Sequence, residues 1–179
     1  MRNIFTALVV ALLALGGLLN ANAAPPELEK DAQAALDALY AGSPGAQALG
    51  ARAKAILVFP NVKKAAIVVG GQGGHGVMFK DGKPAGEYSL LGAQLGLEVG
   101  AQAFSYAVFF MSDRALDKLR AVKGFEIGAD PNLVFADAGA GVQMSTASAQ
   151  ADVYTYVYGQ KGLMAGISLQ GSKISRVKD

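Results

Sequence analysis

The stretch GEYSLLGAQLGLEVGAQAFSYAVFFM, from Gly86 to Met111, decides the fold. Its residues fall into two alternating sets, and a period of two is typical of a β-strand, whose successive side chains point to opposite faces. One set is increasingly apolar, and the other carries glycine, glutamine and glutamate. We therefore predict an extended segment with the apolar set toward a core and the other set toward water or a lumen. The apolar set is Glu87, Ser89, Leu91, Ala93, Leu95, Leu97, Val99 and Ala101, and the other is Tyr88, Leu90, Gly92, Gln94, Gly96, Glu98, Gly100 and Gln102.

A membrane-spanning helix is the alternative for this stretch, because glycine recurs at every fourth residue from Gly92 to Gly100, a spacing that lets membrane helices pack closely. Three polar side chains count against it, since Gln94, Glu98 and Gln102 would lie in hydrocarbon. Strands usually run for about 5 to 6 residues, so a strand of this length must bend or break at one of its glycines.

The first 23 residues predict a secretory signal peptide. They combine a basic start at Arg2, an apolar run too short for a membrane span, and the small-residue site Ala21-Asn22-Ala23. We expect cleavage after Ala23 and export to the periplasm or cell envelope. The sequence has no cysteine, so we expect neither a lipid anchor nor a disulfide, and stability must come from packing.

The remaining chain is long enough for one domain with a real core. Its charge is nearly balanced, with 16 basic and 14 acidic residues in the full sequence. This balance gives no general argument for a nucleic-acid partner.

Three helices are expected from apolar periodicity and capping residues. The first follows the cleavage site and ends at Gly42, the second begins at Ser43-Pro44 and continues to roughly Ala53, and the third covers about 113–122. The first helix carries an acidic polar face, which is typical of a solvated surface. We predict three segments: signal peptide 1–23, N-terminal helix 24–42, and a binding domain 43–179.

Short apolar runs separated by turn residues predict the strands before and after the central stretch. AILVF, AAIVVG and HGVMFK are separated by Pro60-Asn61 and a glycine cluster, and Asp81-Gly82 suits a tight hairpin. FEIG, NLVFAD, DVYTYVYG and GLMAGISLQGSKISRV follow the third helix. The fold class is therefore α+β, with a curved, mainly antiparallel sheet or a small barrel-like sheet.

Three parts of the sequence together resemble the SYLF domain family. They are AKAILVFPNVKKAAIVVGGQGGHGVMFKDGKPAGEYSLLGAQLGLEVGAQAFSYAVFFM, then FEIG, then GQKGLMAGISLQGSKI, and the likeness covers about residues 43–179. The resemblance implies a non-enzymatic module that binds phospholipid; eukaryotic members bind phosphoinositides, and some bind actin. Their lipid contact involves a basic N-terminal segment, whereas the corresponding helix here is acidic. Neither phosphoinositide specificity nor that contact is therefore carried over, and we do not expect actin as a partner of an exported bacterial protein.

The sequence offers little for catalysis or metal binding. GQGGHG, from Gly71 to Gly76, matches the glycine pattern of a dinucleotide site, but a strand rather than a helix follows it, so we predict a flexible or backbone-apposed hairpin loop. His75 is the only histidine, and no serine has the context of an exposed nucleophile. The acidic residues near Asp130 lack calcium-loop spacing. We expect no enzyme activity, no cofactor and no metal.

Four lysines are the first candidates for lipid contact: Lys63, Lys64, Lys80 and Lys83. In an up-and-down meander, the turn after Pro60 and the turn at Asp81 would lie at the same end of the sheet. This basic sheet end would attract an anionic membrane surface. The alternative is a solvated rim, because lysines commonly protect sheet edges and turns.

The secondary candidates are Gln94, Glu98, Gln102, Tyr154, Tyr156 and Tyr158. The glutamine and glutamate row is interpreted as a solvent-facing strip in preference to a lumen site. The tyrosine stripe fits either a core against a helix or a rim at a lipid boundary. The expected function is phospholipid or amphiphile binding in the cell envelope. The alternative is a self-associating structural protein that presents glycine-rich faces to a protein partner.

Overall fold

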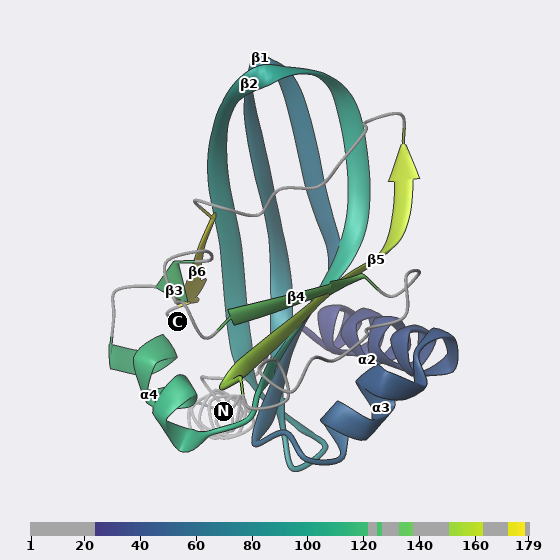
Figure 1. Ribbon diagram of the computed structural model, residues 1–179, viewed down its shortest axis with the longest axis vertical. Helices are drawn as coiled ribbons and strands as arrows, with labels where there is room; N and C mark the ends of the chain where they lie inside the picture. Colours follow the sequence, from purple (N-terminus) through teal and green to yellow (C-terminus); the bar gives the residue numbers. More distant parts are fainter. Residues whose placement is uncertain (1–23, 122–124, 127–132, 138–150, 163–171, 178–179) are drawn as a thin grey trace, which may run out of the picture.

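The computed structural model describes residues 24–121, 125–126, 133–137, 151–162 and 172–177, with only the backbone given for 67–69, 94–99, 121, 125–126, 133–137 and 162. The helices are α2 (Pro26–Gly42), α3 (Pro44–Gly50) and α4 (Asp113–Ala121). The strands are β1 (Ala55–Lys80), β2 (Lys83–Phe110), β3 (Phe125–Glu126), β4 (Leu133–Asp137), β5 (Val153–Gly162) and β6 (Ser172–Arg176). The predicted α+β class is confirmed (Figure 1).

One long hairpin, β1 paired with β2, dominates the sheet. Asp81 and Gly82 form its turn with positive φ angles of 51° and 72°, as the Asp-Gly pair predicted. The predicted three-strand meander is wrong, because its three runs form the single strand β1. Pro60 does not make a turn; it lies where the β1–β2 register shifts, an irregularity that accommodates proline within a strand.

The hairpin bends back on itself midway along both strands (Figure 1). The register skips there, passing from Ile67 opposite Val99 to Val69 opposite Leu95, so β2 has extra residues at the bend. This confirms that so long a strand must bend. The two legs of β1 then approach closely: a Cβ atom at Gly76 would lie 2.6 Å from the carbonyl oxygen of Val58. Glycine is needed at this close approach.

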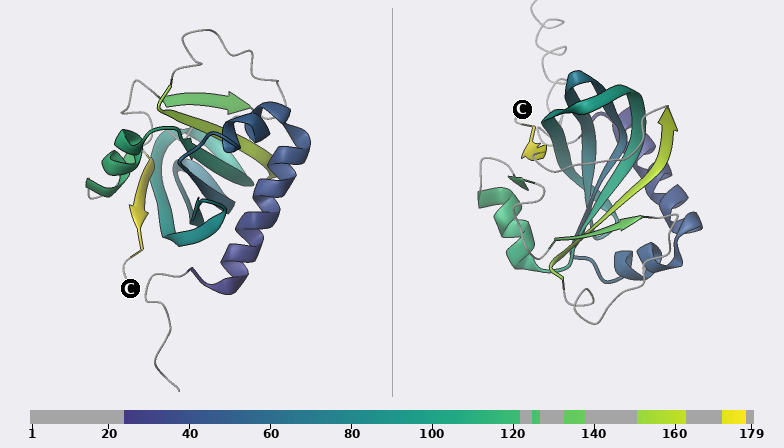
Figure 2. Two further views of the ribbon diagram at one scale, coloured as in Figure 1. Left: turned by 90° about the horizontal axis from the view of Figure 1, so that it is seen from below. Right: turned by 45° about the horizontal axis from the view of Figure 1, so that its top comes forward.

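Among the described residues, the sheet joins six strands, and β1 pairs only with β2. The remaining strands follow the order β3-β6-β2-β5-β4. The pairings within the described part of the chain are antiparallel except that of β4 with β5, which is parallel. β3 and β4 lie at the two edges of this order and do not pair with each other. The described strands therefore form a curved sheet that is not closed into a barrel. Figure 2 shows the curved hairpin from two further directions.

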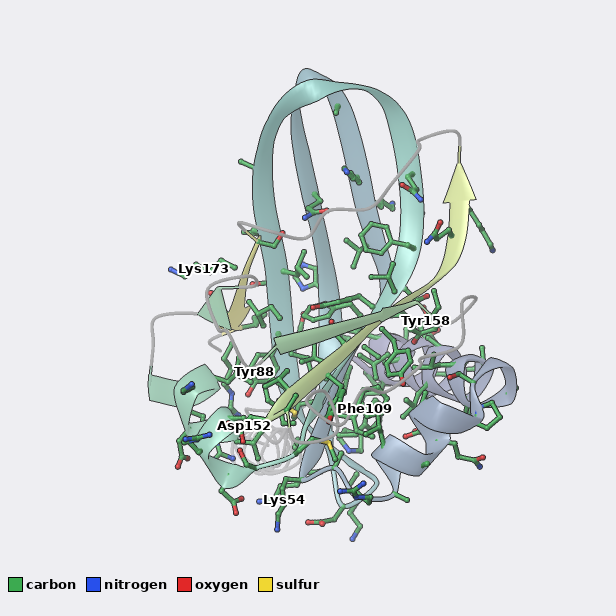
Figure 3. All side chains as sticks on the ribbon, viewed as in Figure 1. Lys54, Tyr88, Phe109, Asp152, Tyr158 and Lys173 are labelled. Carbon is green, nitrogen blue, oxygen red and sulfur yellow. The ribbon has the colours of Figure 1, made fainter. Side chains whose placement is uncertain are left out.

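Two hydrophobic clusters hold the layers together (Figure 3). One joins buried side chains of the bent hairpin, such as Leu57 and Phe104, to Leu116 of α4. The other lies on the opposite face of the sheet, where α2 and α3 pack against residues such as Phe109 and Tyr156. The helix predictions are confirmed, although α3 ends three residues before the expected boundary. No helix in the described ranges is both long and apolar enough to cross a membrane.

The two faces of the central stretch are the reverse of the prediction. Tyr88, Leu90 and Gln102, from the glycine-rich set, are buried, whereas Leu91 and Ala101, from the apolar set, are exposed. The alternation was correct in showing which residues share a face. The direction in which the hairpin bends decides which face is enclosed, and a period of two carries no information on that direction.

Candidate functional site

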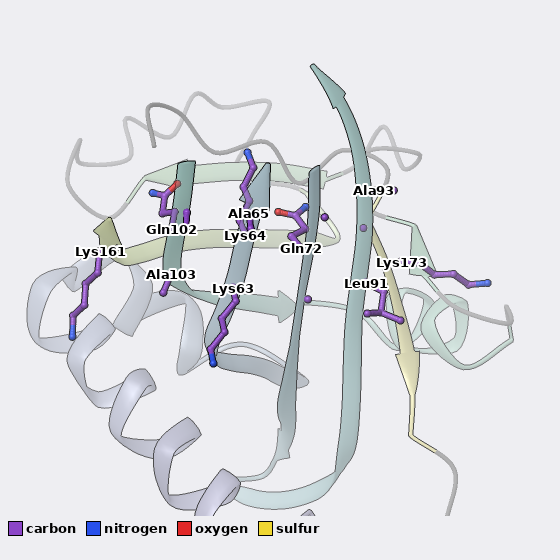
Figure 4. A pocket seen from close by; sticks show the side chains of 14 residues that line it. Lys63, Lys64, Ala65, Gln72, Leu91, Ala93, Gln102, Ala103, Lys161 and Lys173 are labelled. Atoms are coloured by element: carbon purple, nitrogen blue, oxygen red, sulfur yellow. The ribbon is translucent and has the colours of Figure 1, made fainter. Parts of the chain in front are cut away.

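An open groove crosses the hairpin close to its bend, and its volume is about 1120 Å³ (Figure 4). Four stretches of the hairpin line it: 63–65 and 71–73 from β1, and 91–93 and 101–103 from β2. Lys161 of β5 and Lys173 of β6 complete the lining. We call this feature the hairpin groove. Sites for drug-sized ligands measure about 300–1000 Å³, so the groove has room for a long or branched molecule.

Small side chains make up the floor of the hairpin groove. Its smallest exposed residues are Ala65, Gly71, Ala93 and Ala101, which face one another as two pairs in the β1–β2 ladder. Leu91 lies opposite Gly73 and leans toward it, with its Cδ2 atom 3.3 Å from where a Cβ atom would be. The side chain of Leu91 is 66% exposed, and it is the one exposed large hydrophobic residue among the described side chains. The floor is therefore an apolar surface open to water.

Lysines provide all the charge among the described residues that line the groove. Ala103 lies between Lys63 and Lys161 in adjacent strands, and Leu91 lies beside Lys173. These three lysines are exposed. Since no carboxylate belongs to this part of the lining, the groove presents a local positive charge on a chain whose net charge is only +2.

Three nearly buried polar side chains also line the groove, from the face of the strands opposite to that of Lys63. Figure 4 shows Lys64, Gln72 and Gln102 on the side opposite to Lys63. The three are 2%, 5% and 6% exposed, respectively. The Nε2 atom of Gln72 donates a hydrogen bond to the Oγ atom of the fully buried Ser172, which links β1 to β6. This cluster supports the strands that form the floor.

The prediction that four lysines lie together at one end of the sheet is wrong. Lys80 and Lys83 face each other beside the hairpin turn, whereas Lys63 and Lys64 lie near the bend. Lys80 is eight residues beyond Gln72, which places it about 26 Å farther along the strand. Two of the four predicted lysines therefore line the groove, and only Lys63 of these is exposed.

The glutamine and glutamate row is only partly described. Gln102 is buried, so its interpretation as a solvent-facing residue is wrong. Gln94 lies opposite Gly70, and Glu98 lies at the bend; the side chains of both are outside the described part of the chain.

The tyrosine stripe is a core feature. Tyr154, Tyr156 and Tyr158 are buried in the cluster covered by α2 and α3, which decides between the two earlier interpretations. Burial raises the pKa of Tyr158, and the nearby Tyr40 adds to the rise. These side chains do not line the groove.

The glycine motif is not a loop. Gly71 to Gly76 continue β1. Of the prediction for this motif, only the close approach to another backbone segment is confirmed. His75 is exposed, and its Nδ1 atom lies 2.7 Å from the Oε1 atom of Glu87. Within the described ranges, no three residues of metal-ligating type come together. Asp130 lies outside those ranges.

Sequence reasoning missed most residues of the groove, among them Leu91, Lys161 and Lys173. Leu91 was assigned to a core because of its apolar set. The two lysines come from strands far along the chain, and only the pairing of β5 and β6 with β2 brings them to the groove. Both lysines are exposed, at positions where their strands turn a side chain away from the core.

Comparison with known proteins concerns the second part of the chain. Residues 91–179 match the family described as Ysc84, Las17-binding protein actin regulator. These residues belong to the Ysc84 (SYLF) family. The resemblance stated from the sequence is thereby confirmed for residues 91–179. The SYLF match includes the β2 half of the groove with Lys161 and Lys173, whereas β1 precedes it. No curated protein matches the chain.

Proposed function

We propose that this SYLF protein is a non-enzymatic module that binds anionic phospholipid at the hairpin groove. The observation that carries the proposal is an open groove with an apolar floor and with lysines as the only charged residues of its described lining. Membership of the SYLF family supports lipid as the ligand class. The signal-like sequence before Ala24 supports an envelope location, where phospholipid is available.

The expected affinity is modest and depends on salt. Each lysine near an anionic membrane contributes about 1 kcal/mol, so Lys63, Lys161 and Lys173 together contribute about 3 kcal/mol. These side chains are exposed, so salt screens their attraction over a Debye length of about 8 Å at physiological ionic strength. The apolar floor adds a contribution that salt does not screen.

The test removes two groove lysines in the variant Lys63→Ala/Lys161→Ala. We expect binding to phosphatidylglycerol vesicles in a sedimentation assay to weaken about thirtyfold, since about 2 kcal/mol is lost. The matched control is Lys80→Ala/Lys83→Ala, which removes the same charge from two exposed lysines beside the hairpin turn. Equal losses in both variants would show attraction to overall charge and would remove the groove from the proposal.

Gel filtration of the same samples tests the alternative of a self-associating protein. A concentration-dependent oligomer that forms without lipid, together with wild-type protein that does not sediment with anionic vesicles, would favour that alternative.

A further inference from the structure

We propose that the groove docks flat on the surface of an anionic bilayer, with Leu91 inserted among the acyl chains, so that the bound lipid stays in the membrane. This inference rests on the proposed function. It adds that the bound lipid remains part of the bilayer and that Leu91 is the residue that inserts. The alternative is a carrier site that extracts a single amphiphile.

The openness of the groove argues against extraction. Sites that hold a small molecule by itself bury about 70–90% of the ligand surface. Here the floor residues remain exposed, and the floor is a sheet face rather than an enclosed cavity. An acyl chain lying on this floor would keep much of its surface in water. A bilayer covers the same floor without removing any lipid from its neighbours.

Leu91 is placed to enter the bilayer. Its side chain is 66% exposed and is flanked by Gly73 in β1 and Lys173 in β6. Neighbouring small residues leave Leu91 as the largest apolar group on the groove face that is described. Transfer of one leucine side chain out of water corresponds to an affinity gain of about tenfold or more.

The lysines fit the same orientation. Lys63 and Lys161 lie on either side of Ala103, and Lys173 lies beside Leu91, so cationic groups surround the apolar floor. Lysine side chains keep their aliphatic stems on an apolar surface while the ammonium group stays in water. The ammonium groups would therefore meet the lipid phosphates at the membrane surface while the floor contacts the acyl region.

A tryptophan reporter tests this orientation, because the chain has no tryptophan of its own. We expect the fluorescence of Leu91→Trp to shift to the blue with phosphatidylglycerol vesicles and to be quenched by brominated acyl chains. Phosphatidylcholine vesicles should produce neither effect. The control is Asp117→Trp, at a side chain of α4 that is 73% exposed, and its spectrum should stay that of a water-exposed indole.

Leu91→Asp should weaken sedimentation with phosphatidylglycerol vesicles about tenfold or more, without changing the melting temperature beyond a surface substitution. Wild-type protein that leaves the vesicles with one lipid per chain, as measured by phosphorus analysis after gel filtration, would overturn docking and favour extraction. Vesicle-bound Leu91→Trp with a water-exposed spectrum would also overturn docking but leave the proposed function intact. Failure of wild-type protein to bind anionic vesicles would refute both.

Discussion

At the scale of single residues, Asp152 joins the start of α4 to the start of β5. Its Oδ1 atom accepts a hydrogen bond from the Oγ atom of Ser112 at 2.8 Å, and its other oxygen pairs with Arg114. The Oγ atom of Ser112 also accepts from the backbone N–H of Ala115, at the first turn of the helix. One carboxylate thus holds a helix cap and a neighbouring strand together.

Asp152→Asn should lower stability at neutral pH by about 0.5–1 kcal/mol, because Arg114 is mostly exposed and the ion pair is screened. The hydrogen bond from Arg114, followed by that from Ser112, holds the pKa of Asp152 below its ordinary value of 3.8. A lowered pKa in the folded state gives stability that is present above pH 3.8 and is lost as the pH falls through the folded value. The difference between variant and wild type should therefore shrink in acid.

Urea melts at several pH values measure this effect. Asp117→Asn is the control, because Asp117 pairs with Arg120 at 3.8 Å on an exposed surface of the same helix and should change stability little. A difference for Asp152→Asn that persists unchanged at low pH would show that the carboxylate charge is not its cause.

At the scale of elements, the bend of the hairpin depends on the close approach of the two legs of β1. A Cβ atom at Gly76 would lie 2.6 Å from both the Val58 carbonyl oxygen and the Cδ1 atom of Phe59. Gly76→Ala should therefore destabilise the protein by about 1–3 kcal/mol, as overpacking in a core does. Thermal or denaturant melts measure this loss.

Gly71→Ala is the matched control in the same strand, because its nearest contact would be the carbonyl oxygen of Gly92 at 3.8 Å. It should be neutral or slightly stabilising, since alanine loses less backbone freedom on folding than glycine. Equal stability of the two variants would mean that the legs do not approach as closely as described.

The elements differ in how much of them the sequence could predict. The helix starts at Ser43 and near residue 113 and the turn at Asp81-Gly82 depend on local chemistry, and all three were predicted correctly. Pro60 and the glycine run were interpreted as turns because proline and glycine are common in turns. Their place within β1 depends on the partner strand β2, which runs beside them along almost the whole hairpin. Such long-range pairing is not encoded in a local pattern.

At the scale of the whole molecule, the candidate site was predictable only in part. Lys63 and Lys64 were singled out, but the groove depends on β5 and β6 pairing with different legs of β2. That topology brings Lys161 and Lys173 to one surface although they lie far from Lys63 in the sequence. The sequence shows the lysines themselves, but only the bent hairpin and its strand pairing place them on one surface.

A last prediction separates the local charge of the groove from the net charge of the molecule. Gly71→Glu and Gly42→Glu each lower the net charge of +2 by one. Both positions have room for a side chain, since a Cβ atom at Gly71 would meet only the Gly92 carbonyl oxygen at 3.8 Å and one at Gly42 would meet nothing within 4 Å. Only Gly71 lies on the groove floor.

We expect Gly71→Glu to weaken sedimentation with phosphatidylglycerol vesicles at least tenfold, because a carboxylate on the apolar floor must lose water and faces lipid phosphates. Gly42→Glu, at the end of α2, should bind like wild type at physiological salt, since screening limits the reach of its charge to about 8 Å. Circular dichroism and melts of both variants establish that the fold is retained. If the two variants weaken binding equally, the membrane responds to the net charge of the molecule, and the groove is not its contact surface.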